Sequence, residues 1–302
     1  MIRLWVLVFL LLSLVIPSST TAAPLTKEIE VNGARLSYVE QGSGEPMVFV
    51  HGAFSDLRVW EPIREEIAKR YRFIAYTQRY HGVGAWNDDG KQYSVATHVD
   101  DLIKFITSLN VGSVHLVGRS GGGALAVTAA LKNPALIRTL TVHEPALNSV
   151  LPADSAEGKA AREDRAKFSS AAIEASKAGD PVRAARLFIE GVYKLEPGGF
   201  DRLPEAIRTM VLDTARTAPL MFGAPSPPAI MCDELKTFNR PTLVTQGEKT
   251  RANFKLINAE ISKCVPGAQE VSFPNLVHNA PSADPAAFIA ALLEFLAKRQ
   301  EL

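Results

Sequence analysis

Short apolar runs alternate with amphipathic segments along most of the chain. The run at 46–52 is apolar up to Val50, which is typical of a strand buried on both faces. At 93–110 the apolar side chains recur at helical spacing, with Val99, Leu102 and Ile106 on one face. This pattern predicts a succession of strands and helices.

The same patterns predict the other elements. A hairpin is expected at 27–42, where residues alternate on both sides of an Asn-Gly turn. The other predicted strands are 46–52, 71–77, 113–118, 137–144, 241–247 and 269–274. The predicted helices are 60–70, 93–110, 122–133, 253–264 and 284–299. Strands that alternate with helices form a mostly parallel sheet with helices on both faces, so we expect an α/β fold.

One long segment lacks strand patterns. Residues 147–236 are rich in Ala, Arg, Glu and Lys and are interrupted by Pro-rich and Gly-rich stretches. They predict a helical cap inserted into a core made of 24–146 and 237–302. In parallel sheets of this kind, ligands bind outside the carboxyl ends of the strands.

The N-terminus has a different pattern. Arg3 precedes an apolar run at 4–16, and small residues up to Ala22 and Ala23 follow. This is the layout of a signal peptide over 1–23, so we expect an exported protein, periplasmic or secreted. The run is short for a bilayer span, so no membrane span is expected after processing. A buried or anchoring N-terminal helix is the alternative.

Composition limits the partners and the redox chemistry. The chain has 302 residues, 33 basic and 32 acidic side chains and a formal net charge of +1. No nucleic acid or anionic surface is therefore expected as a partner. In an oxidising compartment Cys232 and Cys264 either form a disulfide or remain two buried thiols, and spacing alone does not decide between these.

The residues Gly118-Arg119-Ser120-Gly121-Gly122 form a G-x-S-x-G pattern between a predicted strand and a predicted helix. This context is the one that a nucleophile elbow requires, with Ser120 as nucleophile. A phosphate-binding loop lacks its lysine here, and a dinucleotide fingerprint would need glycine in place of Ser120. The remaining alternative is a glycine-rich turn that serves only close helix packing.

A serine nucleophile needs a base and an orienting acid. His278 follows a predicted strand and precedes the last helix, so we predict it as the base. Glu144 ends the strand after the nucleophile helix and is the predicted acid, with Glu248 as the alternative. Thr250 stands near the place where an aspartate would first be sought.

An oxyanion hole is predicted after the strand at 46–52. The dipeptide His51-Gly52 leads into Ala53, whose backbone N–H, together with that of Gly121, is expected to bind the developing negative charge.

These motifs, in this order, resemble the α/β-hydrolase superfamily from about residue 27 to 300. The resemblance implies Ser120 as nucleophile, His278 as base, and Ala53 and Gly121 as oxyanion donors. The usual acid position, after the strand at 241–246, is where the sequence departs from the family. The segment "TVHEPA" is similar to zearalenone-lactonase-like members, which place a glutamate after the preceding strand, and Glu144 matches it.

We therefore expect a serine hydrolase of small carboxylic esters or lactones, with no metal and no organic cofactor. A cofactor-free perhydrolase, a C–C hydrolase and a hydroxynitrile lyase use the same constellation and stay open. A ligand-binding receptor on a hydrolase scaffold is the alternative from another class. Apolar residues of the cap predict either an apolar pocket or the core of the cap itself: Phe188, Tyr193, Phe200, Met210, Met221 and Phe222.

Overall fold

A computed structural model of the protein describes residues 25–298. The predicted signal peptide, 1–23, lies outside the described residues, so export stays a prediction. Within 25–298, no helix combines the length and the apolar character needed to cross a bilayer.

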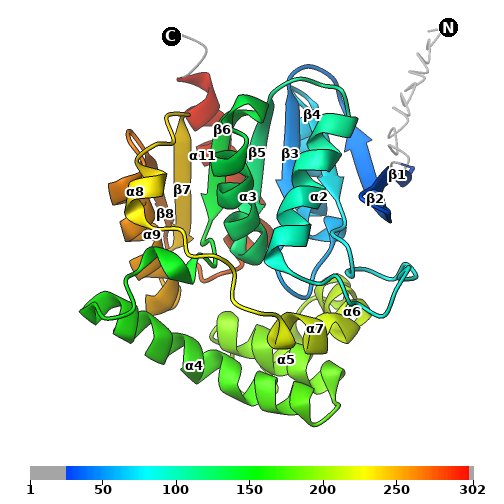
Figure 1. Ribbon diagram of the computed structural model, residues 1–302, viewed down its shortest axis with the longest axis vertical. Helices are drawn as coiled ribbons and strands as arrows, with labels where there is room; N and C mark the ends of the chain where they lie inside the picture. The colour runs from blue at the N-terminus through cyan, green and yellow to red at the C-terminus, as the bar shows by residue number, and fades with distance from the viewer. Residues whose placement is uncertain (1–24, 299–302) are drawn as a thin grey trace, which may run out of the picture.

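Eight strands form one sheet in the order β1-β2-β4-β3-β5-β6-β7-β8 (Figure 1). The strands are β1 (Lys27–Val31), β2 (Ala34–Gln41), β3 (Pro46–Val50), β4 (Arg72–Tyr76), β5 (Val114–Arg119), β6 (Ile137–His143), β7 (Thr242–Gly247) and β8 (Gln269–Phe273). β2 pairs antiparallel with β1 and β4. The six strands β3 to β8 are all parallel to one another. The α/β fold class is confirmed.

Helices cover both faces of the sheet because side chains alternate along each strand. Met47 and Phe49 of β3 pack toward α1 (Glu61–Ala68) and α11 (Pro285–Ala297). Val48 and Val50 point to the opposite face. That face is covered by three helices, α2 (Val95–Ser108), α3 (Ser120–Lys132) and α9 (Ala252–Cys264). A central strand with two buried faces reads as the continuous apolar run seen in the sequence.

Between β6 and β7 the chain forms helices and loops. Its α-helices are α4 (Ala156–Lys177), α5 (Pro181–Val192), α6 (Glu205–Asp213), α7 (Ala218–Gly223) and α8 (Cys232–Leu235). In Figure 1, α4 to α7 lie together at one end of the sheet, whereas α8 lies beside α9. Phe168 and Phe200 are part of a separate apolar cluster of this cap, which also includes Phe54 of the core.

Cys232 and Cys264 form a disulfide, with their Cα atoms 5.2 Å apart. This selects one of the two alternatives that the sequence left open. The bond joins α8 to the C-terminal end of α9, and so fixes the point where the chain returns from the cap to the sheet.

Two local differences from the sequence prediction lie at the carboxyl edge of the sheet. Helix α3 begins at Ser120 rather than at 122, and a short helix, α10 (Ala280–Ala283), precedes the last helix. The first follows from the sharp turn at Ser120, and α10 is only four residues long, so local periodicity registers neither.

Replacing both cysteines by alanine is expected to lower the free energy of unfolding by about 3–4 kcal/mol, because the cross-link closes a long loop in the unfolded chain. Urea denaturation of wild type and the C232A/C264A variant measures this. Reductant should destabilise the wild type and leave the double variant unchanged; equal stabilities of the two proteins would contradict the prediction.

Candidate active site

Ser120 lies at the sharp turn between β5 and α3. Its φ is +52°, in the left-handed region that a side chain other than glycine rarely adopts. The strain of such a turn is typical of a nucleophile elbow. The N-terminus of α3 begins at this residue, so the positive end of the helix dipole lies at Ser120.

Two glycines make this turn possible. A Cβ on Gly118 would lie 2.6 Å from the carbonyl oxygen of Gly122. A Cβ on Gly122 would overlap the carbonyl oxygens of Val50 and His51. The loop after β3 therefore lies directly against the nucleophile turn, with no room for a side chain at Gly122.

Glu144 follows β6 and is fully buried. Its φ of +45° turns the chain at the strand end. One carboxylate oxygen accepts a hydrogen bond from the Gly247 N–H (2.7 Å), and the other accepts from the Thr250 hydroxyl (2.6 Å). The second oxygen also accepts from Nδ1 of His278, at 2.6 Å. The structure thus brings Glu144 and His278 together.

This contact sets the protonation states of the pair. Burial alone would raise the pKa of Glu144, but the His278 and His143 rings and the Thr250 hydroxyl lower it to about 2. Burial lowers the pKa of His278, Glu144 raises it and Arg119 lowers it. The resulting pKa lies below the ordinary value of 6.5. At neutral pH the pair is therefore a carboxylate and a neutral imidazole, with the proton on Nδ1 and a free lone pair on Nε2.

The alternative acid is placed elsewhere. Glu248 is exposed, and its carboxylate accepts a hydrogen bond from the Asn275 N–H. Nδ1 of His278 contacts Glu144 instead.

Two residues that support this pair were not predicted from the sequence. Thr250 donates to Glu144, although the sequence marked its position only as lacking an aspartate. His143 is fully buried, and its Nε2 lies 3.3 Å from the backbone carbonyl of His278. For Thr250 the available signal was a threonine at the usual acid position in a chain that carries a glutamate after the neighbouring strand. We find no such signal for His143.

The loop after β3 carries the predicted oxyanion donor. The hydroxyl of Ser55 donates to the Gly52 carbonyl (2.9 Å), and Nδ1 of His51 lies at the same distance from it. These contacts fix the peptide that links Gly52 to Ala53. A Cβ on Gly121 would lie 3.9 Å from the Ala53 nitrogen, so the two predicted donors are neighbours.

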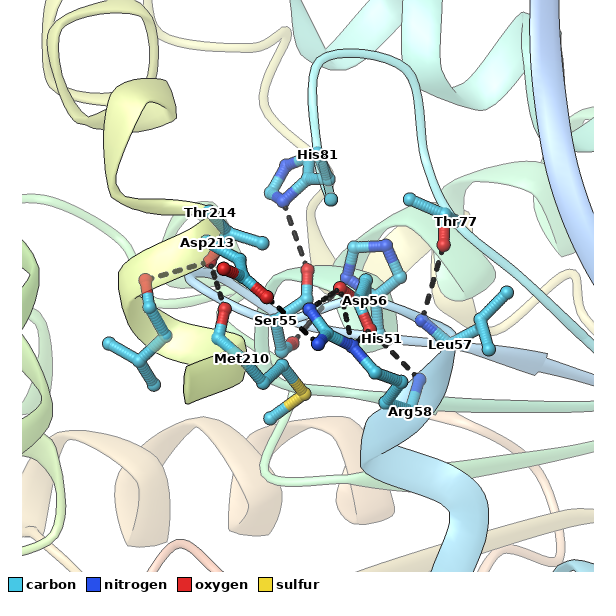
Figure 2. A network of polar contacts seen from close by, with 12 residues as sticks. His51, Ser55, Asp56, Leu57, Arg58, Thr77, His81, Met210, Asp213 and Thr214 are labelled. Carbon is cyan, nitrogen blue, oxygen red and sulfur yellow. Dashed lines mark hydrogen bonds and ion pairs between the residues drawn. The ribbon is translucent and has the colours of Figure 1, made fainter. Parts of the chain in front are cut away.

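The next residues of this loop attach it to the cap (Figure 2). Nδ1 of His81 contacts the Ser55 carbonyl at 3.2 Å. Arg58, in the 3-10 helix η1 (Leu57–Trp60), pairs with Asp56 at 2.6 Å and with Asp213 at the end of α6 at 2.8 Å. The oxyanion loop is therefore held from the core and from the cap.

Ser120 and His278 line one cavity of about 20 Å³, room for about one water molecule. Gly52 and Ala53 border it on the core side. The cap contributes uncharged side chains, namely Phe188, Ile189, Val192, Tyr193, Met210 and Val211. A substrate therefore needs these cap side chains to move aside.

A larger cavity, of about 510 Å³, lies next to the loop 77–92. Asp56 and Arg58 line it, but Ser120, Glu144 and His278 do not. The predicted nucleophile and base therefore lie at the smaller cavity, and reacting groups rather than volume define a candidate active site.

The predicted apolar pocket of the cap divides into two groups. Phe188, Tyr193 and Met210 line the cavity beside Ser120. Phe200 is fully buried within the cap cluster, against which Met221 and Phe222 pack.

A metal site would need a cluster of His, Cys, Asp or Glu side chains. Within residues 25–298, one group is compact enough: Cys232, Glu260 and Cys264. Its two sulfurs are joined in the disulfide and offer no thiolates.

The family model described as "alpha/beta hydrolase fold" matches residues 45–282. The chain belongs to this family. The match spans the oxyanion loop, the nucleophile turn, the cap and His278, so the α/β-hydrolase family covers the whole candidate site.

Similar proteins include several hydrolases. The chain is 28% identical to 2-(acetamidomethylene)succinate hydrolase of Mesorhizobium japonicum over 90% of this chain and 95% of that protein. It is 28% identical to 2-hydroxy-6-oxo-2,4-heptadienoate hydrolase of Pseudomonas putida, over 40% of this chain and 44% of that protein. An esterase structure from Thermogutta terrifontis superposes with a TM-score of 0.69 at 24% identity, covering 91% of this chain and 98% of that one.

All six histidines of this α/β hydrolase lie within the described residues and have lowered pKa values, because burial disfavours their charged form. The pKa falls to about 4 for His51 and His115 and to about 3 for His143. The folded state therefore disfavours protonation of all six rings, and keeps His51, His81, His115 and His143 neutral well below pH 6.5.

The free energy of unfolding is expected to fall as pH decreases from 6.5 toward 4. In that range histidines of the unfolded chain bind protons, whereas the buried histidines of the folded state stay neutral. This difference lowers the free energy of unfolding by up to about 1.4 kcal/mol per pH unit for each ring. Urea midpoints at pH 7.5, 6 and 5 measure the slope. A His115→Gln variant should show a shallower dependence; a midpoint constant from pH 7.5 to 5 would contradict the prediction.

Proposed function

We propose that this enzyme of the α/β-hydrolase family hydrolyses a carboxylic ester or lactone through an acyl-enzyme on Ser120. The observation that carries the proposal is the buried 2.6 Å contact between Glu144 and Nδ1 of His278, beside a cavity that His278 shares with Ser120. This contact leaves Nε2 of His278 as the proton acceptor for the serine hydroxyl.

The proposed reaction proceeds in two halves. Oγ of Ser120 attacks the carbonyl carbon while Nε2 of His278 takes its proton, and the N–H groups of Ala53 and Gly121 bind the oxyanion. His278 then gives the proton to the departing alkoxide, and the acyl group remains on Ser120. Water, deprotonated by His278, attacks the acyl-enzyme; when the intermediate collapses, His278 returns the proton to Oγ of Ser120 and the acid is released.

Glu144 has a distinct part in this mechanism. Its carboxylate holds the Nδ1–H tautomer and stabilises the imidazolium that forms in each half. Because two further donors, Gly247 and Thr250, fix the carboxylate, it stays ionised and correctly oriented although it is fully buried.

A second candidate is hydrolysis of a bond other than an ester. The substrates named for the two relatives, an acetamidomethylene succinate and an oxo-heptadienoate, contain no ester. The C–C hydrolase alternative therefore remains open, and the same serine, histidine and glutamate serve it.

Ser120→Ala is expected to lower kcat/KM for short 4-nitrophenyl esters by about 10⁴-fold or more, because the nucleophile is lost. It should also abolish labelling by a fluorophosphonate probe, which requires an activated serine. Labelled wild type without ester turnover would favour the second candidate. Undiminished turnover by the alanine variant would exclude Ser120 as nucleophile.

Glu144→Gln is expected to lower kcat/KM by roughly 10³-fold or more, because a neutral amide neither selects the Nδ1–H tautomer nor stabilises the imidazolium. The matched control is Glu248→Gln, an exposed position, which should stay within about twofold of wild type. Thermal unfolding verifies that both variants fold. Equal losses in the two variants, or a loss in the control alone, would exclude Glu144 as the orienting acid.

A further inference from the structure

Arg119 precedes the nucleophile, and its side chain lines the same cavity as Ser120 and His278. Only 4% of its surface is exposed. One terminal nitrogen, Nη2, donates to the Tyr193 hydroxyl at 3.3 Å and lies 3.5 Å from the His278 carbonyl. The other, Nη1, is buried with no hydrogen-bond partner.

Two other arginines in the described part of the chain are equally buried, and both have carboxylate partners. Arg79 pairs with Asp101 through two hydrogen bonds of 2.7 and 2.9 Å. Arg64 pairs with Glu61. Within residues 25–298, Arg119 forms no ion pair, and no acidic side chain lines its cavity. The fold therefore leaves one buried guanidinium without a counterion, at the reaction centre.

A buried guanidinium without a counterion destabilises the folded state. A guanidinium remains charged in proteins, and burying a charge without an anionic partner costs several kcal/mol. A buried donor without an acceptor adds to this cost. An apolar side chain of similar volume would pack in this position at a lower cost, so stability does not account for the arginine.

We propose that Arg119 is a specificity-determining residue that binds a carboxylate group of the substrate, so that the enzyme acts on anionic esters or related acids. This inference rests on the proposed function for the site, because it deepens the choice of substrate. A carboxylate would accept from Nη1 and complete the donor set that the protein leaves open.

Tyr193 adds a second contact for the same anion. Its hydroxyl accepts from Nη2 of Arg119, and its own proton remains available to donate to a carboxylate. Tyr193 follows α5 in the cap, so the anion would lie between cap and core. Because Arg119 is adjacent to Ser120 in the chain, the carboxylate must lie within a few bonds of the reacting carbonyl.

Binding without turnover tests the inference separately from the reaction. In a Ser120→Ala protein, glutarate is titrated by calorimetry against its neutral counterpart, dimethyl glutarate. Adding Arg119→Gln should weaken glutarate binding by 10-fold or more, as expected for losing a hydrogen bond to a charged group. Binding of dimethyl glutarate should change by less than twofold. Arg119→Lys, which keeps the charge but not the planar donor set, should give an intermediate loss.

A matched control removes the same charge elsewhere. Arg183→Gln, at an exposed position of α5, should leave glutarate binding unchanged. Kinetics with the active enzyme provide a second measure. For mono-4-nitrophenyl glutarate, Arg119→Gln should raise KM by 10-fold or more, and for 4-nitrophenyl methyl glutarate it should leave KM within twofold.

The outcomes separate the two proposals. Absence of glutarate binding to the Ser120→Ala protein at millimolar concentration would overturn the role of Arg119. Equal losses of affinity for the charged and the neutral ligand, accompanied by a lower melting temperature, would overturn it too, since that pattern indicates a positioning role. If neither ester is hydrolysed by the wild type while Arg119 still controls glutarate binding, the ester reaction fails and the carboxylate site stands.

Discussion

The buried contact between Glu144 and His278 is the interaction on which the rest of the site depends. A carboxylate with no exposed surface persists only if its oxygens are satisfied, and removing one partner of such a pair costs about 3–5 kcal/mol. Three donors meet Glu144: the Gly247 amide, the Thr250 hydroxyl and His278 Nδ1. They come from the end of β7, the turn after it, and the loop before α10. Glu144, which follows β6, thus contacts two segments distant from it in sequence, the end of β7 with its turn and the loop before α10, and holds the imidazole in one orientation.

This arrangement explains why the sequence lacks an aspartate after β7. The turn after β7, where an acid would be sought first, carries Thr250. Its hydroxyl donates to Glu144, the predicted acid, which follows the neighbouring strand, so the turn contacts the carboxylate as a donor. β6 and β7 are hydrogen-bonded neighbours, and their parallel direction brings both ends to the same edge. A displacement of the carboxylate by one strand therefore leaves it within reach of His278.

The predictable part of the molecule follows from periodicity and from turns that tolerate few residues. The buried strands, the amphipathic helices and the glycine turn at Ser120 all leave a local signal, and parallel topology then places strand ends together. The contacts that support the site leave no such local signal in the sequence. His143 reads as one more strand residue, and its contact with the His278 carbonyl exists only after folding. α10 is four residues long, too short for a helical period to appear. Arg119 occupies the variable position of its motif, so its burial and its missing counterion emerge only from three-dimensional packing.

The two charges of the site act on His278 in opposite directions. Glu144 raises the pKa of the ring, while Arg119 lowers it and so opposes the imidazolium that the proposed mechanism requires. A substrate carboxylate bound to Arg119 would neutralise that opposing charge at the moment when His278 has to accept a proton. A neutral substrate would leave it in place. The same guanidinium would thereby act twice, by holding the anion and by coupling its presence to the basicity of His278. Discrimination between charged and neutral substrates would then extend from KM into kcat.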